Sequence, residues 1–143
     1  MIEYQTDNIF AKILRGEIPC EKVFEDDTSI AFMDIMPQSN GHLLVVPKRA
    51  SVGLLDADPD IFGQLFTNVQ KLARAAKQAF RADGVTIMQF NGPAAGQTVF
   101  HLHVHIIPRY EGVSLYSHGA APADPEVIKS NAAKIRAALS SEI

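Results

Sequence analysis

The chain has 143 residues, 47% of them apolar, which suffices for one domain with a single hydrophobic core. Its 13 Lys and Arg against 16 Asp and Glu give a net charge of −3 without a run of like charge, which argues against non-specific nucleic-acid binding and favours a small partner. A single cysteine excludes an internal disulfide, and with neither a leader-like N-terminus nor a segment near the roughly 20 apolar residues of a membrane span, we expect a cytoplasmic protein without a membrane partner.

The first elements are a short helix and a group of strands. The pair Asp7-Asn8 offers an N-cap to a helix that begins at residue 9 and ends at Gly16. Three segments with strand character follow, of which the first two form a β-hairpin and the third ends at a proline: residues 22–25, 29–34 and 43–46.

The second half begins with a long helix. Apolar residues recur there with a period of 3.6 from Pro59 to about Gly84. Two more strands and a final helix complete the pattern: residues 85–90, about 98–107, and 125–141. Strands and helices do not alternate regularly, and most successive strands are close enough to pair antiparallel. The sequence therefore predicts an α+β fold in one domain, residues 1–143.

Three histidines occupy alternate positions of the last predicted strand, His101, His103 and His105. Because strand side chains point to opposite faces with a period of two, all three imidazoles share one face. A single histidine in a core is usually a satisfied polar residue, but three adjacent imidazoles need several partners and repel one another when protonated. A functional site is the better interpretation.

Two kinds of site fit this pattern. Neighbouring histidines, about 6.6 Å apart, can share a zinc ion, but the outer pair is about 13 Å apart and would need help from His42 or a carboxylate. Alternatively, the middle histidine attacks phosphorus, while His101 and His105 orient it and deliver a proton. Backbone amides of residues 96–98 lie where phosphate oxygens would need donors.

Residues 96–109 resemble the signature of the histidine-triad (HIT) family, in which three histidines alternate with hydrophobic residues. The resemblance continues through residues 8–10, 16–19, 32–35, 37–38 and 41–48, so that it covers residues 8 to about 110.

The resemblance implies a role for each matching residue. His103 is the nucleophile, which becomes a nucleotidyl-phosphohistidine, with His101 and His105 beside it. His42 supports them, and Asp34 holds the ribose hydroxyls. The remaining positions are apolar contacts of the base at Phe10, Phe32 and Ile35, and contacts of phosphate or leaving group at Asn91, Gln97 and Thr98. By composition alone the apolar three would be ordinary core, and Asp34 a turn cap.

The resemblance also implies an antiparallel sheet of about five strands, a homodimer, and hydrolysis of a purine nucleotide derivative to the nucleoside monophosphate without a cofactor. Some bacterial relatives bind a structural zinc through Cys-x-x-Cys, but Asn8 and Ala11 stand at those positions. We therefore expect no such zinc.

The substrate stays open at this point. The first half of the chain resembles the nucleoside phosphoramidase branch, whereas residues 91–98 and 107–109 are also close to the dinucleoside polyphosphate hydrolases. A nucleotide-binding adaptor with weak catalysis and a metal-dependent hydrolase are also compatible with the sequence.

Overall fold

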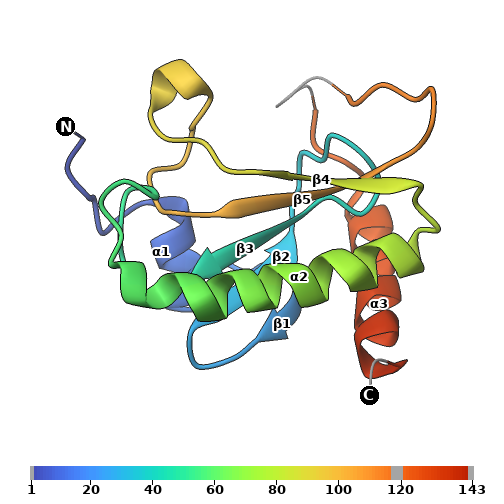
Figure 1. Ribbon diagram of the computed structural model, residues 1–143, viewed down its shortest axis with the longest axis horizontal. Coiled ribbons are helices and arrows are strands. Elements are labelled where there is room, and N and C mark those ends of the chain that lie inside the picture. The colour runs from blue at the N-terminus through green and yellow to red at the C-terminus, as the bar shows by residue number, and fades with distance from the viewer. Residues whose placement is uncertain (1, 117–120, 142–143) are drawn as a thin grey trace.

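The computed structural model describes residues 2–116 and 121–141. Within these residues five strands form one antiparallel sheet in the order β1-β2-β3-β5-β4 (Figure 1). The strands are β1 (Lys22–Glu25), β2 (Ser29–Met33), β3 (Leu43–Pro47), β4 (Gly84–Met88) and β5 (Val104–Arg109). This confirms the predicted α+β fold with its sheet of about five strands.

Three α-helices accompany the sheet in the described residues. They are α1 (Ile9–Leu14), α2 (Phe62–Ala79) and α3 (Pro125–Ser141), and two short 3₁₀ turns lie at Pro59–Ile61 and Pro93–Ala95. The side chain of Asn8 accepts a hydrogen bond from the Ala11 amide at 2.9 Å, which caps α1 as predicted. No helix in these residues is both long and apolar enough to cross a membrane.

The two faces of the sheet carry separate hydrophobic clusters, with α2 and α3 on one face and α1 on the other (Figure 1). The larger cluster, under α2 and α3, includes Leu43, Val45, Leu102, Val104 and Ile106. The smaller one joins α1 to alternate residues of β2 and β3: Phe10, Ile13, Ile30, Phe32, Leu44 and Val46. The apolar residues between the histidines therefore pack under the long helix, which leaves the histidines to the α1 face.

Strand β5 differs from the prediction at both ends, because it begins at Val104 instead of residue 98 and runs to Arg109. Its pairing with β3 covers only Val104 to Ile106, and β4 pairs with it from His105 onwards. Residues 98–103 therefore lie outside the paired part of the sheet. Pro108 is tolerated because it lies beyond the pairing with β3, where its missing N–H is not needed.

Gly41 shapes the turn that leads into β3. Its φ is 91°, and a Cβ atom there would lie 2.4 Å from the ring of Phe80, just after α2. Only glycine combines this backbone conformation with such a close approach. The next residue, His42, is fully buried at the start of β3.

Candidate active site

A cleft of about 420 Å³ lies between α1 and the sheet, and most of the predicted site residues meet there. Its lining includes Phe10, Phe32, Asp34, Ile35, Thr98, His103 and His105. Asp34 and Ile35 follow the end of β2, and the two histidines come from β5 and the segment before it. The cleft is thus formed by residues distant in sequence that the α1 face of the sheet brings together.

One end of the cleft is apolar. The ring of Phe10 meets that of Phe32 edge to face, with ring centroids 5.4 Å apart, and stands at 89° to the ring of His103 at 4.8 Å. Ile9, Ile13, Ile18 and Leu44 continue this wall. Cys20 also lines it, and burial raises the pKa of its thiol. A planar aromatic group would bury apolar surface on these side chains.

Hydrogen bonding places the proton of His103. Its Nδ1 lies 2.6 Å from the backbone carbonyl oxygen of His101, which can only accept. Nδ1 therefore carries the hydrogen, and Nε2 carries the lone pair. Because the ring lines the cleft, His103 offers a nucleophilic nitrogen to a bound group.

His101 has both ring nitrogens engaged. Nε2 donates to the carbonyl oxygen of Pro47 at 2.8 Å, which leaves Nδ1 to accept from the hydroxyl of Tyr4 at 2.6 Å. The side chain is 1% exposed, and burial lowers its pKa, while the hydrogen bond to Pro47 works in the opposite direction. His101 is therefore a fixed, neutral imidazole.

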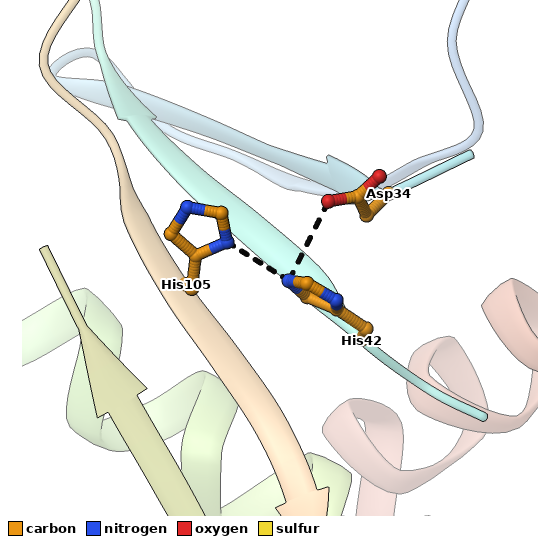
Figure 2. A group of neighbouring side chains, drawn as sticks. All are labelled: Asp34, His42 and His105. Carbon is orange, nitrogen blue, oxygen red and sulfur yellow. Dashed lines mark hydrogen bonds and ion pairs between the residues drawn. The ribbon is translucent and has the colours of Figure 1, made fainter. Parts of the chain in front are cut away.

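A hydrogen bond joins His42 to His105 (Figure 2), and the ring of His105 lies next to that of His103. The backbone N–H of Gln38 donates to Nδ1 of His42 at 3.0 Å, so that the proton of a neutral His42 is on Nε2. That Nε2–H donates to Nδ1 of His105 at 2.9 Å. The proton of His105 consequently sits on its Nε2.

Asp34 joins this group from the end of β2. Its Oδ2 lies 3.5 Å from Nε2 of His42 (Figure 2), and its Oδ1 accepts a hydrogen bond from the backbone N–H of Met36 at 2.8 Å. The side chain is 16% exposed and lines the cleft. A carboxylate in this position can accept hydrogen bonds from a vicinal diol.

Asp34, His42 and His105 offer three ligand atoms within 4.8 Å of one another, close enough for a metal ion. The donor set does not suit one. Zinc needs the lone pair of Nε2 of His42, and the displaced hydrogen would have to move to Nδ1, where it would face the N–H of Gln38. Two N–H donors, Nδ1–H of His42 and the backbone N–H of Gln38, would then face each other without an acceptor. The arrangement therefore fits proton transfer better than metal binding.

Asn91 and Gln97, which the resemblance assigned to phosphate, line a neighbouring pocket of about 220 Å³ and are absent from the lining of the cleft. Gln97 is 3% exposed, donates to the carbonyl oxygens of Val52 and Val99, and accepts from the N–H of Gly92. Asn91 accepts from the N–H of Leu54. Both side chains hold loops together here, and their contact with substrate stays a prediction.

Sequence reasoning missed Tyr4. It lies 97 positions from His101, in a segment without periodicity, so no local pattern connects the two residues. A second feature also appears only in three dimensions. Within the described residues, the cleft lining contains no Lys or Arg and one carboxylate, that of Asp34.

Comparison with known proteins is consistent with this geometry. The HIT domain family matches residues 15–112. Over 113 residues the chain is 39% identical to a protein of Arabidopsis thaliana named adenylylsulfatase HINT3. The aligned region covers 79% of this chain and 57% of the plant protein. The chain thus spans little more than half the length of this plant relative.

Two solved structures share the fold. A HIT-like protein of Bartonella henselae, described as involved in cell-cycle regulation and bound to an unknown ligand, is 54% identical with a TM-score of 0.89, covering 95% of this chain and 99% of that one. A hypothetical histidine triad nucleotide-binding protein of Sulfolobus tokodaii is 33% identical with a TM-score of 0.83, covering 92% and 91%.

Proposed function

This chain belongs to the HIT domain family, and on that premise we propose that it hydrolyses purine nucleotide derivatives at the α-phosphorus, releasing the nucleoside monophosphate. The observation that carries the proposal is the hydrogen bond from Nδ1 of His103 to the carbonyl oxygen of His101, because it leaves the lone pair on Nε2 of a residue in the cleft.

In the first step Nε2 of His103 forms a bond to phosphorus, and the bond from phosphorus to the leaving group breaks. The leaving group keeps the electron pair and takes the proton from Nε2 of His105, and the negative charge left on that ring is balanced by the positive charge on the phosphorylated His103 until water returns the proton. The rings of His103 and His105 are 5.1 Å apart, so the positive charge that His103 acquires favours loss of this proton. Water then attacks phosphorus, returns a proton to His105 and regenerates His103.

The lining of the cleft supports one class of substrate. The wall around Phe10 and Phe32 suits a purine, and Asp34 suits the ribose hydroxyls. The absence of Lys and Arg from the described lining disfavours a leaving group with several negative charges. This supports a phosphoramidate of adenosine or guanosine over a dinucleoside polyphosphate. The name of the plant relative makes adenylyl sulfate a further substrate to compare.

We test this with a panel of adenosine phosphoramidate, adenylyl sulfate and diadenosine tetraphosphate, each with chelator, measuring released monophosphate. The phosphoramidate should turn over fastest, and chelator should not slow it. His103→Asn should lower kcat by several orders of magnitude while monophosphate binding persists. An acid-labile adenylate on His103, trapped by rapid quench, would support the mechanism. Full activity of His103→Asn, or zinc-restored loss in chelator, would overturn it.

We also propose a homodimer. β4 is an edge strand, and beside it an apolar groove of about 320 Å³ runs between β4 and α2, with Phe66 and Ile87 43% and 47% exposed. A second copy would cover both the strand edge and the groove. Light scattering should give twice the 15.6 kDa of the chain, and Ile87→Asp should reduce it to the monomer value. A wild-type monomer at micromolar concentration would contradict the proposal.

A further inference from the structure

The N-terminal segment reaches the histidine triad through Tyr4. Its hydroxyl donates to Nδ1 of His101 at 2.6 Å, and the two rings meet edge to face with centroids 5.6 Å apart. No role proposed above uses this contact, although it is among the shortest side-chain hydrogen bonds in the described residues.

The segment that carries His103 is not held by strand pairing. The pairing of β3 with β5 stops at Val104, so residues 101–103 lie outside the sheet. One backbone hydrogen bond, from the N–H of Leu102 to the carbonyl oxygen of Ser51 at 3.0 Å, joins them to a neighbouring loop. Leu102 also packs in the larger hydrophobic cluster, and the His101 ring makes two further hydrogen bonds, to Pro47 and to Tyr4.

Through His101, these hydrogen bonds affect the position of His103. Tyr4 and Pro47 fix the ring of His101 from its two nitrogens, and the backbone carbonyl of His101 receives the Nδ1–H of His103 at 2.6 Å. A shift of His101 would move the acceptor that determines which nitrogen of His103 holds the lone pair. Small displacements of a reacting atom are costly to catalysis.

We infer that Tyr4 is a positioning residue, whose hydroxyl holds His101 so that the carbonyl of His101 keeps His103 in its nucleophilic tautomer. The inference rests on the proposed role of His103, and Tyr4 itself touches no reacting atom. It assigns a catalytic consequence to a residue outside the matched segment, residues 15–112.

The test is Tyr4→Phe, which removes the hydroxyl and keeps the ring. Tyr110→Phe is the matched control, because the hydroxyl of Tyr110 donates at the same distance, 2.6 Å, to the carbonyl oxygen of Phe80, away from the cleft. With the phosphoramidate, Tyr4→Phe should lower kcat about tenfold with KM unchanged. Tyr110→Phe should leave both constants at the wild-type values.

A second measurement does not depend on turnover. Long-range ¹H–¹⁵N spectra of the imidazole rings should show His103 as the Nδ1–H tautomer in the wild type and as a mixture in Tyr4→Phe. Adding phenol to Tyr4→Ala should restore activity, whereas toluene should not. An unchanged kcat and an unchanged His103 tautomer in Tyr4→Phe would overturn the inference. If the wild type lacks hydrolase activity, the spectra still decide whether Tyr4 fixes the tautomer.

Discussion

The two sides of His103 are built from the same residue type but differ in their hydrogen-bond partners. On one side His101 is buried and neutral, with Pro47 and Tyr4 occupying its two nitrogens. On the other side His105 receives a hydrogen bond from His42, which in turn receives one from the backbone of Gln38. The first arrangement can only hold a position, whereas the second can pass a proton.

The difference shows that the spacing of the three histidines determines which face of the strand they share, but not the role of each histidine. From the sequence, His101 and His105 are both expected to orient the nucleophile and deliver protons. In the structure the hydrogen-bond partners of the two rings differ, since His101 donates its only N–H to the carbonyl oxygen of Pro47, which cannot pass a proton on, whereas His105 is linked to a second imidazole.

The largest effect should come from the proton-passing side. His105→Asn should lower kcat for a phosphoramidate about 10² to 10⁴-fold, because the amine then leaves without its proton donor. With a nitrophenyl ester, whose leaving group needs no proton, the loss should be at least about tenfold smaller. Parallel steady-state kinetics on both substrates measure the ratio. Equal losses would show that His105 does not protonate the leaving group.

A smaller effect on kcat is expected from His42, the hydrogen-bond donor to His105. His42→Leu removes the hydrogen-bond donor to His105 and leaves the N–H of Gln38 without its acceptor. The substitution should lower kcat about tenfold and the free energy of unfolding by about 1–3 kcal/mol. His42→Gln can keep a donor near the same place and should recover part of kcat. Urea unfolding checks the stability change. If Gln and Leu behave alike in kcat, the chain through His42 carries no proton.

On the holding side, His101→Phe should lower kcat about tenfold by releasing the segment around His103. The loss should be the same for the phosphoramidate and the nitrophenyl ester, because His101 donates no proton to either. A loss that depends on the leaving group would erase the distinction between the two sides.

The smallest effect concerns pH. Burial lowers the pKa of His101 below its ordinary 6.5, so the unfolded chain binds its proton more readily. The contribution of His101 to the free energy of unfolding should therefore be constant above about pH 6.5 and fall as pH decreases below it. Paired carboxylates such as Glu25, whose pKa is lowered to about 2, contribute only at more acidic pH. Between pH 5 and about 6.5, His101→Phe should lose part of this slope. An identical slope in both proteins would contradict the assignment.

The sequence predicted what depends on local pattern. Alternation at residues 101–106 placed the histidines on one face and Leu102 and Val104 on the other, because side-chain direction in an extended chain needs no knowledge of the neighbours. The predicted start of β5 was wrong because it depends on neighbouring strands, which the local pattern does not show. Residues 98–100 have strand-forming side chains, but a strand requires a partner, and β3 and β4 have both ended before reaching them.

Contacts between distant segments were beyond the sequence. Nothing near Tyr4 indicates that its hydroxyl meets His101, and nothing near Gln38 indicates that its N–H sets the proton of His42. The resemblance supplied Asp34 and His42 as site residues, and the structure brings both beside His105. It also grouped Gln97 with the phosphate contacts; the side chain is buried and makes three hydrogen bonds, to the backbone of Val52, Gly92 and Val99, and its contact with phosphate stays a prediction.

Cys20 gives the apolar end of the cleft a practical use. It is the one cysteine in the sequence and lines the cleft, so a thiol-directed fluorophore or spin label would attach at a single, known place. Because burial raises the pKa of this thiol, labelling should be slow at neutral pH and quicken in alkali. A nucleotide occupying the cleft should shield it. The labelling rate of Cys20 therefore reports whether a nucleotide occupies the cleft, and its measurement does not require hydrolysis.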